Sequence, residues 1–215
     1  IPYAFMTAWT ALVDKCRLGS RTPGKKVFIQ GGAGAVGSAA VQIAKYFGAY
    51  VAVSCSERDM GFAKEIGADV VIDRRKDDYA ARLSDFDIAL CCADPSEEKK
   101  MLSVLRRGGG AVYATVIHPT LTLTEEHGLL KGFWKARQAL RAAMRSPEGK
   151  GRRIEWVFFE ASKDGLDAMA EMAAAGKLKA PQVAQTFPLA QAKEAHLAVE
   201  AGSHGKVLLE MGRPH

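Results

Sequence analysis

A chain of 215 residues, 48% of them hydrophobic, is long enough for one α/β domain with a sizeable core. It contains no run of eighteen apolar residues, so we expect no membrane-spanning segment. The formal net charge of +6 is compatible with a mitochondrial matrix protein or with a weak attraction to polyanions, and it establishes neither.

The cysteines indicate the redox state of the compartment, and the first residue bears on whether the chain was processed. None of Cys16, Cys55, Cys91 and Cys92 has C-x-x-C spacing, which predicts free thiols in a reducing compartment rather than a zinc site or a disulfide framework. Because the sequence begins at Ile1 rather than Met and shows no targeting peptide, we expect a processed or partial chain.

The first half of the chain alternates between strand and helix patterns. A helix is expected over residues 1–18, and a break containing Gly and Pro follows at 19–24. The expected strands then cover residues 27–29, 50–54, 70–73, 86–92 and 111–116. Helices are expected between them at residues 38–47, 57–66, 77–83 and 97–105. This alternation predicts an α/β fold with a doubly wound parallel sheet and right-handed crossovers.

After His118 the rhythm changes. We expect a long amphipathic helix, a polar loop, a strand, two helices and a last strand, at residues 129–146, 147–151, 154–159, 166–175, 191–201 and 206–210. We divide the chain into a helix and linker (1–24), a nucleotide-binding domain (25–160) that carries a basic helical insertion (129–153), and C-terminal helices with a strand (161–215).

Three glycines stand between the first strand and the helix that follows it. Gly32, Gly34 and Gly37 have the spacing G-x-G-x-x-G in a strand–turn–helix context, which is typical of dinucleotide binding in a Rossmann fold. Gly32 would permit a sharp turn, Gly34 close approach of a pyrophosphate, and Gly37 close packing of the helix on the strand. The helix N-terminus would attract the phosphates. The predicted contacts are made by the backbone of Gly32, Ala33, Gly34, Ala35, Val36 and Gly37.

The end of the second strand bears on the choice between the two nicotinamide cofactors. An NAD site needs a carboxylate here, and this chain has Ser54 and Ser56, whose small hydroxyls would admit a 2′-phosphate. Arg58 and Arg74 follow nearby strand ends, where guanidinium groups would hold that phosphate. We therefore expect NADPH. Two alternatives stay open: both arginines are solvated surface charges, or Glu57 supplies the acid of an NAD site.

The segment 131–153 is strongly basic. Its only acid is Glu148, against Lys131, Lys135, Arg137, Arg141, Arg145, Lys150, Arg152 and Arg153. Apolar residues occupy other positions of the expected helix: Leu130, Phe133, Trp134, Leu140 and Met144. Such a helix is usually a solvated face over a core stripe. The alternative is docking on an acidic protein partner or an anionic membrane surface. Nucleic acid is not expected, because interleaved aromatics and known binding motifs are lacking.

Further short motifs occur along the whole chain in a fixed order. They lie at residues 1–9 (IPYAFMTAW), 67–73 (GADVVID), 86–88 (FDI), 176–178 (GKL), 185–189 (QTFPL) and 204–207 (HGKV). Together with the glycine turn they resemble the cofactor-binding half of the medium-chain dehydrogenase/reductases, in the zinc-independent quinone-reductase branch. In that family a GroES-like domain precedes the Rossmann domain and supplies most of the substrate pocket. That domain is absent here, so we expect C-terminal elements that normally return to it.

The resemblance also implies positions around the nicotinamide: Cys92, Val116, Phe159, Ser203 and His204. Relatives often have Asp-Asn-Val-Gly where this chain has Cys91 to Asp94, and Arg where it has His204. Zinc-dependent members have a Cys ligand at the position of Tyr3, so we expect no metal. At least one of Phe158 and Phe159 is expected to pack in the core.

These observations predict the NADPH-binding domain of a zinc-independent reductase that transfers hydride to a quinone or enone. The sequence offers no convincing general acid, so the catalytic residues remain unknown. The alternative is a non-catalytic Rossmann-fold accessory subunit of a larger, mitochondrial assembly. We expect the mitochondrial matrix as the location, or otherwise the cytoplasm.

Overall fold

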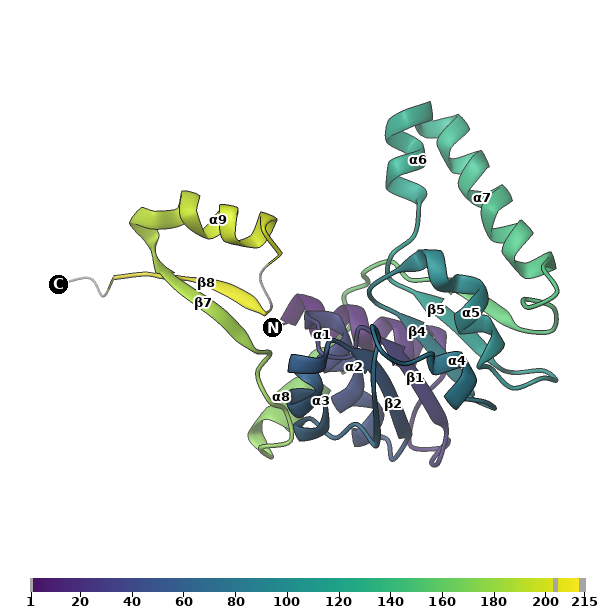
Figure 1. Ribbon diagram of the computed structural model, residues 1–215, viewed down its shortest axis with the longest axis horizontal. Coiled ribbons are helices and arrows are strands. Elements are labelled where there is room, and N and C mark those ends of the chain that lie inside the picture. The colour runs from purple at the N-terminus through teal and green to yellow at the C-terminus, as the bar shows by residue number, and fades with distance from the viewer. Residues whose placement is uncertain (1, 203–204, 213–215) are drawn as a thin grey trace.

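A computed structural model describes residues 2–202 and 205–212. Its centre is a six-stranded parallel sheet with the order β3-β2-β1-β4-β5-β6 (Figure 1). The strands are β1 (Lys26–Gln30), β2 (Tyr50–Cys55), β3 (Val70–Asp73), β4 (Ile88–Cys91), β5 (Val112–Thr115) and β6 (Arg153–Trp156). The predicted doubly wound α/β fold is confirmed. The strand order reverses beside β1, where open α/β sheets bind their ligands.

Helices cover both faces of the sheet, and each face has its own apolar core. Strand β1 shows the alternation, since Val27 and Ile29 join one core and Phe28 joins the other. The first core is covered by α1 (Pro2–Trp9), a π-helical turn (Thr10–Lys15), α2 (Ala35–Tyr46), α3 (Met60–Glu65) and α8 (Lys163–Ala174). The second is covered by α4 (Tyr79–Arg82), α5 (Glu98–Ser103) and one end of α7 (Leu129–Arg145).

A helical hairpin projects from the sheet domain (Figure 1). It consists of α6 (Thr120–His127), which the sequence did not predict, and α7. The helices meet closely at Gly132, where an added Cβ would lie 2.4 Å from the Leu123 carbonyl oxygen. Only the far end of α7 returns to the domain, through Leu140 and Ala143 in the second core. No helix among the described residues combines the length and the hydropathy that crossing a bilayer requires.

The C-terminal residues form a separate βαβ unit that extends away from the sheet domain (Figure 1). It contains β7 (Val183–Pro188), a short 3₁₀ turn (Leu189–Gln191), α9 (Ala192–Glu200) and β8 (Lys206–Glu210). Strand β8 pairs in parallel with β7, which the sequence did not predict, and not with the main sheet. Two strands and one helix bury little, so this unit exposes Val183, Leu189, Leu197, Val199, Leu208, Leu209 and Met211.

The glycine turn after β1 depends on close backbone contacts. The tight left-handed conformation occurs at Gly31 (φ 79°), one residue before the position that the sequence indicated. Gly32 is needed for another reason, because its Cβ would lie 2.5 Å from the Val53 Cβ. The N–H groups of both Gly31 and Gly32 donate to the Ser54 carbonyl, at 2.9 and 3.1 Å. The turn is thereby fixed against the end of β2.

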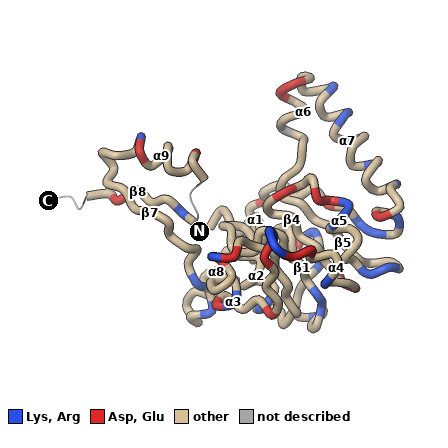
Figure 2. Tube along the Cα trace, in the orientation of Figure 1, with Lys and Arg blue, Asp and Glu red and all other residues tan. Residues whose placement is uncertain are grey.

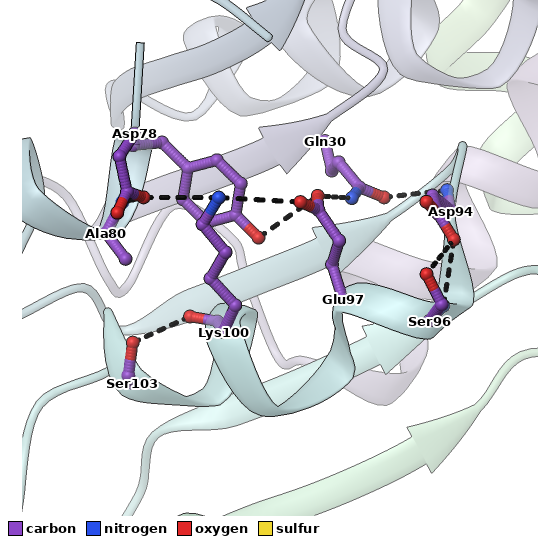
Figure 3. A network of polar contacts seen from close by, with 9 residues as sticks. Gln30, Asp78, Ala80, Asp94, Ser96, Glu97, Lys100 and Ser103 are labelled. Atoms are coloured by element: carbon purple, nitrogen blue, oxygen red, sulfur yellow. Dashed lines mark hydrogen bonds and ion pairs between the residues drawn. The ribbon is translucent and has the colours of Figure 1, made fainter. Parts of the chain in front are cut away.

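A polar network holds the loop after β4 beside this turn (Figure 3). The Gln30 side chain, at the end of β1, is buried. Its Oε1 accepts from the Asp94 N–H at 2.9 Å and from Cys91 Sγ at 3.3 Å, and its Nε2 donates to the Glu97 carboxylate at 2.5 Å. One amide side chain therefore joins β1, β4 and the loop that contains Cys92.

The network continues through Glu97 to α4. The Glu97 carboxylate also accepts a hydrogen bond from the Tyr79 hydroxyl at 3.3 Å. Burial beside this carboxylate raises the pKa of Tyr79. Lys100 lies between two acids, 3.1 Å from Asp78 and 3.5 Å from Glu97, with its ammonium 4.3 Å from the centre of the Tyr79 ring. The loop beside the glycine turn is therefore anchored to two helices as well as to two strands.

A first prediction concerns Gly37. An added Cβ would lie 2.1 Å from the Gly31 carbonyl oxygen, which is backbone and cannot rotate away. We expect Gly37→Ala to lower the free energy of unfolding by about 1–3 kcal/mol or more, measured by urea denaturation. Gly61→Ala in α3 is the control, because nothing lies within 4 Å of its added Cβ and Ala favours a helix. Equal stability of the two variants would contradict this account of the turn.

A second prediction concerns Gln30. Gln30→Leu removes one partner of the Asp94 N–H and one of the Glu97 carboxylate, both in part-buried hydrogen bonds, and loss of a typical hydrogen bond costs about 0.5–1.5 kcal/mol. We expect the Asp94 amide to exchange its hydrogen faster while the amides of β2 keep their protection, as measured by hydrogen exchange. Ser103→Ala removes only an exposed hydrogen bond to the Lys100 carbonyl and should change neither. Unchanged exchange at Asp94 would show that the network does not hold the loop.

Candidate functional site

A hollow of about 210 Å³ lies at the carboxyl ends of β1, β2, β3 and β4. Its lining comes from segments far apart in the sequence: Gly31, Ala33, Gly34, Cys55, Ser56, Asp59, Arg74, Cys92, Ala93, Gln182 and Gly205. The sheet order reverses at this edge, so the hollow occupies the switch point where nucleotide ligands bind in such folds.

The glycine turn forms one side of the hollow. Ala33 and Gly34 line it, and α2 begins directly after them at Ala35. The first N–H groups of a helix have no acceptor within the helix and suit an anion. Gly32 and Gly37 are buried and shape the turn from behind, while Val36 packs against the first core. The predicted stretch therefore divides into residues that face the hollow and residues that support it.

Two charged residues, one after β2 and one after β3, line the hollow. Arg74 is exposed and lines it, as does the carboxylate of Asp59. The Ser56 hydroxyl donates a hydrogen bond to that carboxylate. Sequence reasoning missed Asp59. The signal was present in the spacing from Ser56 to Asp59, which resembles a capping box at the start of the helical turn after β2.

The other residues predicted for the ribose end lie elsewhere. Ser54 is fully buried in β2, its hydroxyl has no partner among the described residues, and it contributes its carbonyl to the glycine turn. Arg58 lines a neighbouring hollow with Gln185 and the end of α9. Glu57, the alternative acid, pairs with Lys76 at 2.7 Å on the surface and does not line the main hollow.

The thiols of the hollow are not prepared for nucleophilic chemistry. Burial, together with the nearby carboxylates of Asp59 and Asp73, raises the pKa of Cys55 to about 11. Burial also raises the pKa of Cys92, which lies beside Cys91. Since the thiolate is the reactive form, both side chains remain neutral thiols near pH 7. They act here as small apolar lining groups.

Phe159, one of the residues predicted for the nicotinamide end, and its neighbour Phe158 each contact another aromatic ring. Phe159 stacks on Tyr3, with ring centres 4.7 Å apart and planes 14° apart. Phe158 lies against His118, whose ring stacks on Trp156 at 5.6 Å. The expectation that Phe158 or Phe159 packs in the core is wrong: their exposed fractions are 49% and 43%. The chain leaves the sheet after Trp156, and Val157 is the residue that enters the core.

None of these rings lines the hollow. Of the positions implied for the nicotinamide, Cys92 lines the hollow, Val116 packs against the first core, and Phe159 stands on the surface. Ser203 and His204 lie outside the described residues. Across residues 2–202 and 205–212, no group of three His, Cys, Asp or Glu side chains is arranged to hold a metal ion. Zinc independence stays a prediction.

Comparison with known sequences gives a consistent set of relatives. Residues 66–209 match the family model described as zinc-binding dehydrogenase. The chain is 35% identical to the NAD(P)H oxidoreductase RTN4IP1, mitochondrial, of Danio rerio over 98% of its length and 56% of the relative's. It is 32% identical to the Homo sapiens protein of the same name, over 98% of this chain and 54% of that relative. The chain thus spans about half the length of the curated relatives that it matches.

Solved structures share the fold over nearly the whole chain. A quinone oxidoreductase from Coxiella burnetii has a TM-score of 0.74 at 22% identity, covering 98% of this chain and 59% of its own. An NAD-dependent alcohol dehydrogenase has a TM-score of 0.72 at 25% identity, covering 99% and 57%. The family model covers about two thirds of the chain, from residue 66 to residue 209. The chain belongs to the zinc-binding dehydrogenase family, among the medium-chain dehydrogenase/reductases.

Proposed function

We propose that this chain is the cofactor-binding half of a nicotinamide-dependent oxidoreductase. The observation that carries the proposal is the hollow at the switch point, where the glycine turn, the start of α2 and Arg74 converge. The residues fit a dinucleotide: Gly34 presents backbone without a side chain, and the first turn of α2 presents N–H groups. The names of the relatives, NAD(P)H oxidoreductases, support the same cofactor class.

We propose NADPH as the form that binds. Arg74 would hold the 2′-phosphate, and the Ser56 hydroxyl leaves space for it. Asp59 opposes this preference, because its carboxylate repels a phosphate and would instead accept a hydrogen bond from a ribose 2′-hydroxyl. Its hydrogen bond from Ser56 occupies one side of the carboxylate. The preference for NADPH is therefore set by the balance of one cation against one anion.

The acceptor that we propose is a quinone or enone, as the named quinone oxidoreductase neighbour suggests. A bound reduced nicotinamide supplies a hydride, and the chain's own residues orient it and exclude water. The stacked rings of Tyr3 and Phe159 are exposed and offer a flat apolar surface that we propose for the acceptor. The mitochondrial location of the relatives is proposed for this protein as well.

The alternative is an accessory subunit that uses the fold as a scaffold and carries out no reaction. Two features of the sequence favour this alternative. The segment Cys91 to Asp94 departs from the pattern of related enzymes beside the cofactor site, and the basic residues 131–153 offer a contact for an acidic protein or an anionic membrane. A titration separates the two functions, since a scaffold has no need of the cofactor. Absence of any binding of NADPH or NADH would favour the accessory subunit.

The choice of cofactor is tested by charge changes at the hollow. Arg74→Ala should weaken NADPH binding about tenfold or more, because a charged hydrogen bond contributes about 1.5–3 kcal/mol, and should leave NADH binding unchanged. Asp59→Asn should strengthen NADPH binding. Calorimetric titration measures both, and Arg58→Ala, a neighbouring arginine that faces another hollow, is the matched control. A wild-type preference for NADH would overturn NADPH and identify Asp59 as the selecting residue.

The reaction is tested on the 215-residue chain alone. Hydride transfer requires donor and acceptor carbons about 3–3.5 Å apart, and relatives are nearly twice as long as this chain. We expect NADPH binding by calorimetry without reduction of quinones in a spectrophotometric assay, and activity only when the remaining part of the protein is present. Robust turnover by the isolated chain would show that one half of the fold is sufficient.

A further inference from the structure

The α6–α7 hairpin has an inner and an outer side. Gly132 and Ala136 are buried on the inner side, where α6 packs, and Leu140 continues that side into the core. Positions 130, 134, 137, 141 and 145 follow helical spacing along the opposite side, so they form one stripe. We call this stripe of Leu130, Trp134, Arg137, Arg141 and Arg145 the outer face of α7; all its members are exposed.

Large apolar side chains are exposed at the end of the hairpin farthest from the sheet domain (Figure 1). The exposed fractions are 81% for Leu129, 89% for Leu130, 63% for Phe133 and 60% for Trp134. Contiguous apolar side chains of this size on a projecting element are typical of an interaction site. No described residue of the domain covers them.

The charges on the same helix have no counter-ions. Lys131 and the outer-face arginines Arg137, Arg141 and Arg145 are exposed, and none pairs with a carboxylate within the described residues. No Asp or Glu occurs between Gly128 and Pro147, and the nearby acids of the hairpin belong to α6 (Figure 2). The later basic residues differ, because Arg152 bonds to backbone carbonyls and Arg153 pairs with Glu155. Of the basic residues between 131 and 153, most of those without a carboxylate partner therefore lie on α7.

We propose that the outer face of α7 docks on the surface of an anionic phospholipid bilayer. The helix would lie along the interface, with Leu130 and Trp134 of the outer face entering the headgroup region, Phe133 at the side of that face, and the arginines meeting lipid phosphates. Leucine and aromatic residues interleaved with basic ones on one exposed helix are typical of such docking. An acidic protein would match the basic side chains equally well. A contact based on charge alone, however, gives no role to the four large apolar side chains at the end of the hairpin farthest from the sheet domain.

The experiment is sedimentation of the chain with vesicles of phosphatidylcholine, with or without phosphatidylserine. We expect binding only to the vesicles that contain phosphatidylserine, weaker at high salt because exposed charges are screened. Reversal of Arg137, Arg141 and Arg145 to Glu should reduce the binding about a hundredfold or more, since each basic side chain contributes about fivefold near an anionic surface. The control reverses Lys64, Lys99 and Lys193, an identical charge change on other exposed elements, and should retain most of the binding.

The fluorescence of Trp134 separates insertion from charge attraction alone. A blue shift is expected when phosphatidylserine vesicles are added, and Trp134→Phe should abolish it, because Trp9 is buried and Trp156 is half-buried against His118, so neither should report on the vesicles. Urea denaturation of each variant verifies that it is folded. Absence of sedimentation at low salt, equal binding to neutral vesicles, or equal losses in the two triple variants would each overturn the proposal. An acidic protein partner would then remain for the basic helix.

Discussion

One backbone arrangement determines the geometry of the candidate site. The Ser54 carbonyl, at the end of β2, accepts the N–H groups of both Gly31 and Gly32. This pair of hydrogen bonds joins β1 and β2 beyond the last ladder residue, and it leaves space for α2 only because Gly37 has no side chain. The direction of α2, the exposure of Gly34 and the width of the hollow all follow from this contact. A side chain at Gly32 or Gly37 would separate α2 from the strands and displace the N–H groups of α2 from the site.

The charges at the other end of the hollow are arranged less rigidly. Arg74 follows β3 and Asp59 follows β2, so adjacent parallel strands deliver a cation and an anion to one place. Neither side chain is buried, and solvent screens each of them. Discrimination between two cofactors that differ by a phosphate therefore depends on a small difference between opposing interactions. Such a balance is easily shifted by a single substitution, whereas the glycine turn tolerates almost none.

Much of this architecture was predictable from local sequence patterns. The buried strands β1 to β5 are short apolar runs, and the glycine spacing identified the turn and α2. Elements that depend on distant partners were not predictable in the same way. Strand β7 is exposed and exists through pairing with β8, and α6 is stabilised where Gly132 of α7 approaches it. The local pattern of apolar residues does not indicate either of these contacts between distant residues.

The site shows the same division between local and distant information. The residue types around the hollow were expected, but the burial of Ser54 follows from the position of β2 between two other strands. The direction of Arg58 depends on α9, which lies far along the chain. Asp59 was missed because the position expected for an acid was the strand end itself. The helical turn after β2 supplies a carboxylate from four residues beyond Cys55.

The C-terminal βαβ unit has a mechanical consequence for the hollow. Its two strands begin at the rim, where the Lys206 N–H donates to the Gln182 carbonyl at 2.7 Å, and both Gln182 and Gly205 are lining residues. The rest of the unit extends away from the sheet domain with its apolar side chains uncovered. One wall of the hollow is thus held by a unit whose other end exposes apolar side chains. A contact made at that end would act on the wall through β7 and β8 without touching the site itself.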